Sequence, residues 1–168
     1  MGEIKQRVEV LAPHYLKTLK FSGYHPSRTL KIMPPLMKET FKVTSTNFFE
    51  DIIKWDTSGE TTMFFGAWRG KYTEDERTTR WIQVKVQGEQ NEKTLKGKVT
   101  IWLRSYLITT FKYSNPIIKE FLRLYSYYFY SERRRIYTEA ARNLLNILEK
   151  ELRVQLEEAK APTEETGE

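Results

Sequence analysis

Alternation between apolar and polar residues dominates the middle of the chain. In residues 81–87 it is strict, with Ile82, Val84 and Val86 set against Trp81, Gln83, Lys85 and Gln87. A two-residue period places the two groups on opposite faces of a half-buried strand. We therefore predict a strand here and further strands over residues 61–72 and 98–113, while residues 48–56 remain ambiguous.

Short polar links separate these segments. Residues 57–60 indicate a turn, residues 74–76 a solvated hairpin tip, and residues 88–97 a polar connection. Consecutive strands joined in this way favour an antiparallel meander. The last strand is expected to have two faces, one with Val99, Ile101, Leu103, Leu107 and Phe111, the other with Lys98, Trp102, Arg104, Tyr106, Ile108 and Lys112.

Helical periodicity replaces the alternation after Asn115–Pro116. Asparagine caps free backbone N–H groups, and proline suits the first helical position, so a helix is predicted to start here and to run to about Leu156. Forty residues at about 1.5 Å each would span ~60 Å, more than a domain of this size, so we expect a break near Ser131–Arg135 or a projecting helix. The predicted buried stripe is Tyr137, Ala141, Leu144, Leu148 and Leu152.

The first forty residues carry weaker signals. Ile4, Val8 and Leu11 recur at helical spacing and predict a short helix, followed by a loop, a possible strand at Arg28–Ile32 and a boundary at Pro34–Pro35. We divide the chain into an N-terminal extension integrated in the domain (1–40), an α+β core (41–156) and a disordered acidic tail (157–168).

Composition restricts the classes of function. The 168 residues are 39% hydrophobic and contain no cysteine, which suits one packed domain and excludes disulfides and thiolate metal sites. No secretory signal and no run of about 20 apolar residues is visible, so we expect a cytoplasmic protein without a transmembrane segment. Residues 155–168 hold one lysine and five glutamates and so carry a net charge of −4. The whole chain carries +6, so the remaining residues carry +10. Such a body can attract nucleic acid, anionic lipid or an acidic protein, or carry its charge for solubility alone.

Catalytic motifs are missing from the sequence. Gly66–Lys71 is one residue shorter than a phosphate-binding loop, and Tyr72 stands where such a loop needs serine or threonine. His14 and His25 are the only histidines, and no spacing indicates a metal site. We therefore expect binding rather than catalysis, with no cofactor and no metal, although an enzyme acting inside a cavity stays a third option.

Several segments of the second half resemble a known superfamily: Gly97–Leu103, Asn115–Ile118, Arg133–Arg135 and Asn143–Leu145. They are similar to the close of START-like (polyketide-cyclase type, SRPBCC) helix-grip domains. The resemblance implies a curved antiparallel sheet packed by a long C-terminal helix, with a cavity between them for an apolar small molecule. Members of this superfamily include both enzymes and carriers.

Two sets of candidate binding residues follow. In the first hypothesis, a small hydrophobic or lipid-like ligand or a protein partner occupies the space between sheet and helix, lined by Trp68, Trp102, Tyr106, Tyr125 and Tyr128. In the alternative, the protein binds nucleic acid or the ribosome through Lys85, Arg104, Arg133, Arg134 and Arg135. The second hypothesis depends on the sheet's other face, where Trp81, Gln83 and Lys85 could lie beside Trp102, Arg104 and Tyr106. Rings interleaved with cations suit single-stranded nucleic acid, but the same rings would be core if a helix covered that face.

The aromatic run Tyr125–Tyr130, followed by three arginines, has two interpretations. It is either an interfacial anchor for anionic lipid or RNA, or a helix buried on most sides with tyrosine hydroxyls at its wet edge. We favour burial. The oligomeric state is left open by the sequence.

Overall fold

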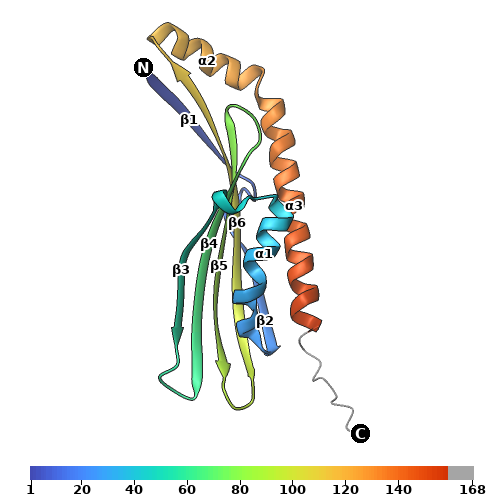
Figure 1. The fold of residues 1–168 in the computed structure, drawn as a ribbon. Helices are drawn as coiled ribbons and strands as arrows, with labels where there is room; N and C mark the ends of the chain where they lie inside the picture. Colours follow the sequence, from blue (N-terminus) through green and yellow to red (C-terminus); the bar gives the residue numbers. More distant parts are fainter. Residues whose placement is uncertain (159–168) are drawn as a thin grey trace.

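A computed structural model describes residues 1–158, which form one six-stranded antiparallel sheet and the helices that pack against it (Figure 1). The strand order is β1-β6-β5-β4-β3, and β2 also pairs with β6. The long C-terminal helix α3 (Ser131–Glu158) packs against this sheet. The predicted α+β class, with an antiparallel sheet and a long C-terminal helix, is confirmed.

The predicted meander forms the main part of the sheet. It consists of β3 (Phe48–Asp56), β4 (Thr61–Thr73), β5 (Thr78–Asn91) and β6 (Lys96–Tyr113). Each strand pairs antiparallel with the next. The link predicted at residues 88–97 is shorter than expected, because β5 and β6 extend their ladder into it, as in the Gln90–Gly97 pair.

The N-terminal region differs most from the prediction. Residues 4–11 are not helical: β1 (Gly2–Glu9) and β2 (Lys17–Tyr24) pair with the two halves of β6. Ile4 and Val8 satisfy both a two-residue and a helical period, and the strand places Gln6 between them on the same face. The strand predicted at Arg28–Ile32 is also wrong, because α1 (Thr29–Phe41) begins there after a 3-10 turn (Pro26–Arg28) and contains both Pro34 and Pro35. A second 3-10 turn (Ser45–Asn47) leads into β3.

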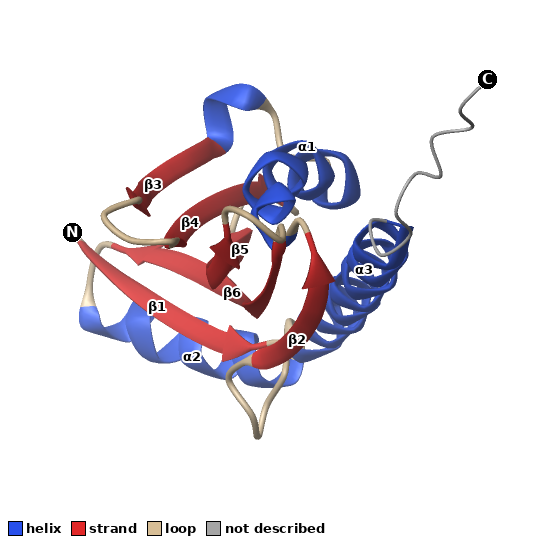
Figure 2. Ribbon diagram, turned by 90° about the horizontal axis from the view of Figure 1, so that it is seen from below, coloured by secondary structure: helices blue, strands red, loops and turns tan. Residues whose placement is uncertain are grey.

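Both α1 and α3 cover the same face of the sheet, which we call the covered face (Figure 2). Side chains from the two layers fill the space between them, and the fully buried ones include Trp68, Ile82, Leu103, Leu145 and Leu148. The Trp68 indole lies back over Gly66, where an added Cβ would be 2.4 Å from the ring. The glycines of the failed phosphate-loop pattern therefore make room for core packing, Gly66 under Trp68 and Gly70 beside Val43.

The C-terminal helical segment breaks where the sequence predicts. The first part, α2 (Pro116–Tyr128), starts at Asn115, whose side chain accepts a hydrogen bond from the Ile118 N–H at 2.9 Å. The second part, α3, buries Ala141, Leu148 and Leu152 as expected. It continues through Glu158, two residues into the predicted tail, and the remainder of that tail lies outside the described residues.

The β4–β5 turn is a structural clamp rather than a solvated tip. The Asp75 carboxylate accepts hydrogen bonds from the hydroxyls of Tyr130 (2.6 Å) and Tyr137 (2.9 Å), and from the Arg77 and Thr78 N–H groups. Burial raises the pKa of Asp75, but these hydrogen bonds outweigh burial and the net shift is downward. Burial, together with the bond to Asp75, raises the pKa of Tyr130 to about 12. The clamp ties the hairpin to the start of α3.

Candidate functional site on the open sheet face

The face of the sheet turned away from α1 and α3 carries the candidate site, and we call it the open face. The register pairs Trp81 with Tyr106, Gln83 with Arg104, and Lys85 with Trp102 across β5 and β6. This is the arrangement that the sequence predicts for the sheet's second face. Neither of the two helices that cover the core packs on it, so Trp81, Trp102, Arg104 and Lys85 stay at least partly accessible, whereas Tyr106 is buried by its neighbours.

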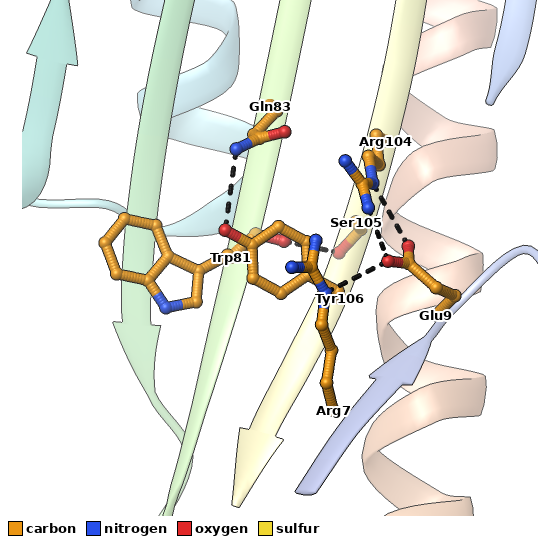
Figure 3. A network of polar contacts seen from close by, with 7 residues as sticks. All are labelled: Arg7, Glu9, Trp81, Gln83, Arg104, Ser105 and Tyr106. Carbon is orange, nitrogen blue, oxygen red and sulfur yellow. Dashed lines mark hydrogen bonds and ion pairs between the residues drawn. The ribbon is translucent and has the colours of Figure 1, made fainter. Parts of the chain in front are cut away.

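Three aromatic rings form a row across this face. Phe49 of β3 stacks near Trp81 with 6.4 Å between ring centroids, and Trp81 stacks near Tyr106 at 6.3 Å. The Arg7 guanidinium lies 3.8 Å from the centroid of the Tyr106 ring (Figure 3). The Lys71 ammonium lies 6.0 Å from the ring centroids of both Phe49 and Trp81. Because these rings stack on one another and on cations, the row mainly stabilises the face itself.

A polar network borders the row. Glu9 of β1 accepts hydrogen bonds from Arg104 (2.6 Å) and Arg7 (3.1 Å), and the Gln83 amide donates to the Tyr106 hydroxyl at 3.5 Å (Figure 3). Hydrogen bonding to Glu9 raises the pKa of Arg104. Both arginines are thus held in place by one shared carboxylate.

Next to the row lies a groove of about 700 Å³. Its lining combines apolar rings, amides and cations: Tyr15, Leu16, Phe65, Gln83, Lys85, Gln87, Trp102 and Arg104. Tyr15 and Leu16 come from the β1–β2 connection and are 63% and 51% exposed. Among the described residues, neither Trp102 nor Phe65 stacks on another ring or on a cation. Their ring faces are therefore available to a planar ligand.

Lysines without carboxylate partners lie in the groove and elsewhere on the open face. Most arginines of the open face are paired, as Arg69 is with Asp51 (2.8 Å) and Arg104 with Glu9. In residues 1–158, by contrast, no ion pair is formed by Lys20, Lys54, Lys71, Lys85 or Lys112, which the strand register places on this face. This leaves an uncompensated positive charge beside accessible rings.

The residues of the first hypothesis do not share one space. Trp68 is 1% exposed on the covered face, whereas Trp102 and Tyr106 lie on the open face. Tyr125 and Tyr128 belong to α2, where Tyr125 packs edge-on against Phe111 (6.3 Å) and Tyr128 is 67% exposed. The expected common lining is corrected for a physical reason: the alternation of a strand sends Trp68 and Trp102 to opposite faces, because their partner residues Val84 and Lys85 are neighbours in β5.

The residues of the alternative hypothesis divide in a similar way. Lys85 and Arg104 meet in the groove together with Trp102. The arginine triplet is in the first turns of α3, away from the groove. There Arg134 bonds Gln6 and Ser126, and Arg135 pairs with Glu132 (2.6 Å). Among the described residues neither Arg133 nor Arg134 forms an ion pair, but the Arg134 guanidinium is held by the neutral groups of Gln6 and Ser126.

Other residues of the site were not predicted. Phe65, Tyr15 and Leu16 line the groove, and Phe49 ends the aromatic row. Because successive strand residues point to opposite faces, a core position for Phe64 would have assigned its neighbour Phe65 to the open face. The connection bearing Tyr15 and Leu16 has no periodicity that would place it over a sheet.

Metal chemistry has no visible support in residues 1–158, where no cluster of three or more histidine or acidic side chains could hold an ion.

Comparisons with other proteins give little guidance. No family model matches the chain, and the curated proteins likewise contain no match. A solved structure of a protein of unknown function from Staphylococcus aureus is 9% identical, with a TM-score of 0.33 over 92% of this chain and 96% of that one. An uncharacterised protein from Rhizobium leguminosarum is 8% identical, with a TM-score of 0.23 over 89% of this chain and 99% of that one. Scores this low carry no inference about ligand or activity.

Proposed function

We propose that the protein binds single-stranded nucleic acid on its open face. Unpaired bases would stack on Trp102 and Phe65 in the groove, while Lys85 and the other unpaired lysines of the open face neutralise the phosphates. The observation that carries this proposal is the groove itself, which brings Lys85, Trp102 and Arg104 together on a face that α1 and α3 leave uncovered.

The chemistry of the face suits this ligand better than a duplex. Stacking needs accessible ring faces, which duplex bases do not offer because they already stack on each other. The amides of Gln83 and Gln87 add hydrogen-bond donors and acceptors for base edges. Further unpaired lysines lie along the same face of the sheet, so a flexible backbone can follow them.

Fluorescence anisotropy with a labelled single-stranded oligonucleotide tests the proposal. Trp102→Ala should weaken binding by roughly 5- to 150-fold, since a base–aromatic stack contributes about 1–3 kcal/mol. Trp55→Ala is the matched control, because Trp55 is 52% exposed on the edge strand β3 and does not line the groove. Equal affinities for both variants, or no binding by the unaltered protein, would contradict the proposal.

A second candidate is a small amphipathic ligand in the same groove. The groove volume of about 700 Å³ lies in the usual range for small-molecule sites, roughly 300–1,000 Å³, and the groove lining is rich in apolar groups. A lipid-like anion could pack on Leu16 and Trp102 and pair with Lys85. Native mass spectrometry of the purified protein would reveal such a ligand as an added mass, and extraction of that mass should increase the affinity for the oligonucleotide.

We further propose a distant relation to the helix-grip superfamily. The last strand β6 leads through Asn115–Pro116 into the C-terminal helices, and α3 packs on the covered face of the antiparallel sheet, as the resemblance implies. This relation concerns the fold only, because the groove lies on the face opposite the one where those domains would hold a ligand.

A further inference from the structure

The outward face of α2 exposes a continuous apolar surface. Ile117, Phe121, Leu124 and Tyr128 follow one another at intervals of four, three and four residues, the spacing of one helix face. Their exposed fractions are 82%, 66%, 59% and 67%. We call these four residues the α2 stripe. The interpretation of this segment as a helix buried on most sides is therefore wrong.

The opposite side of α2 is firmly attached to the body. Ser126 is buried, its hydroxyl donates to the Gln6 side chain at 2.7 Å, and Tyr125 packs edge-on against Phe111. Arg134 bonds both Ser126 and Gln6. Because these contacts fix the rotation of the helix, the α2 stripe faces outward as a consequence of the fold.

The position of α2 leaves its outer side accessible. Figure 1 shows α2 at one end of the molecule, next to the end of β6 and the start of β1. Helix α1, and the part of α3 beside it, lie towards the other end. A flat surface could therefore approach α2 without first meeting the rest of the protein.

The apolar sector of α2 is unusually broad. Tyr127 and Phe129 are 72% and 73% exposed and lie on either side of the α2 stripe. At about 100° per residue, the sector from Tyr127 across the α2 stripe to Ile118 covers ~180° of the helix circumference; it also contains the partly buried Tyr125 and one charged residue, Glu120. A groove in a protein partner needs a stripe of only about 100°, whereas a bilayer interface surrounds half of a helix lying in it.

Charges around this sector favour an anionic surface. Glu120 is paired with Arg123 at 3.1 Å, so the carboxylate nearest the α2 stripe is neutralised. Lys119 lies over the Tyr113 ring (5.5 Å), and neither it nor Lys112 forms an ion pair among the described residues. Exposed tyrosines next to a body whose residues 1–154 carry a net charge of +10 match the region of anionic lipid headgroups.

We propose that α2 lies in the plane of an anionic lipid bilayer surface, with the α2 stripe inserted between headgroups. Helix α2 has 13 residues, about 20 Å, and the residues described contain no helix long and apolar enough to cross a bilayer. Attachment is thus peripheral. The site is separate from the open-face groove and does not depend on the function proposed for it.

Vesicle co-sedimentation of the full chain tests this proposal. The unaltered protein should sediment with vesicles of phosphatidylcholine and phosphatidylglycerol, and added sodium chloride or pure phosphatidylcholine should reduce the bound fraction. The double substitution Phe121→Ser with Leu124→Ser should lower the partition coefficient roughly tenfold or more, because it removes two large apolar side chains from the inserted face. Ile147→Ser with Val154→Ser is the matched control on α3, where both residues are about half exposed, and it should leave sedimentation unchanged.

The outcomes separate a lipid surface from the other occupants of α2. Failure of the unaltered protein to bind anionic vesicles would overturn the proposal, as would equal losses in the two double variants. Light scattering on the lipid-free protein provides a second measurement: a dimer that the Phe121→Ser/Leu124→Ser variant converts to monomer would assign the α2 stripe to self-association instead. A normal melting temperature for that variant would confirm that it folds.

Discussion

The two faces of the sheet differ in whether their polar side chains have partners within the protein. On the covered face Thr78, Ser105 and Arg80 are buried, and each bonds a protein partner; Arg80, for example, bonds Glu74 at 2.5 Å and the Phe41 carbonyl at 3.1 Å. On the open face several lysines have no carboxylate partner among the described residues. Most polar groups buried by packing find partners within the fold, with the Nε of Arg80 as an exception, whereas exposed ones can be left for a ligand.

The strands themselves produce this difference. Val84 and Lys85 are neighbours in β5, yet Val84 is fully buried and Lys85 is exposed in the groove. A single sequence thereby specifies a core and a binding surface through its alternation, and substitutions on the two faces should have separable effects.

The largest expected effect is on stability, from the covered face. Trp68→Ala should lower the free energy of unfolding by about 3–5 kcal/mol, because it empties a fully buried site between the sheet and α1. Trp102→Ala should lower the free energy of unfolding by only about 1 kcal/mol, since that side chain is half-buried. Urea denaturation of both variants measures the contrast, and similar losses would show that the two faces do not differ as described.

The next effect comes from the clamp at the β4–β5 turn. Asp75→Asn should destabilise the protein by about 2–3 kcal/mol near neutral pH, because it weakens hydrogen bonds to an ionised carboxylate. The pKa of Asp75 is lowered on folding from 3.8, so its contribution is present above about pH 4 and is lost as the pH falls through the folded value. Denaturation at neutral and acidic pH should therefore show the difference between the two proteins shrinking in acid. A difference that grows in acid would contradict this assignment.

A smaller effect should appear in the salt dependence of oligonucleotide binding. Lys85→Glu should reduce the slope of log affinity against log salt by about 0.7 or somewhat more, the value for one phosphate contact of a single strand. Lys150→Glu makes the same change of charge on an exposed site of α3 and should alter the slope less. Anisotropy titrations across a range of salt concentrations measure both slopes. An unchanged slope for Lys85→Glu would show that Lys85 does not contact a phosphate.

The smallest effect is expected from a paired surface residue of the open face. Asp51→Ala breaks the ion pair with Arg69, which is substantially exposed and should contribute less than about 1 kcal/mol to stability. The same change frees Arg69, so oligonucleotide affinity should rise slightly. A thermal melt and one binding curve are sufficient, and a fall in affinity would indicate that Asp51 itself contacts the ligand.

Much of the central fold could be predicted from the sequence because its signals are local. The alternation at residues 81–87 fixes which side chains share a face, and Asn115–Pro116 marks the helix start whatever surrounds it. The neighbours Lys85 and Trp102 follow from these patterns once the two strands pair in register.

The remaining features depend on contacts that no local pattern reports. Ile4 and Val8 fit two periods, and only pairing with β6 makes their segment a strand. Pro34 and Pro35 lie inside α1, where the packing of Met33, Leu36 and Met37 on the core supports the helix. Which face of the sheet the helices cover is likewise a tertiary outcome, and it decided that Trp68 would be core while Trp102 stayed accessible.

The four tryptophans allow the most direct test of the open-face interface, because each reports on a different environment. Trp81 and Trp102 lie on the open face, Trp68 is buried on the covered face, and Trp55 is on the edge strand. A ¹H–¹⁵N spectrum recorded during titration with a single-stranded oligonucleotide resolves their indole N–H signals. We expect the Trp102 signal to shift most and the Trp68 signal to stay in place; a shift of Trp68 with Trp102 unmoved would contradict binding on the open face.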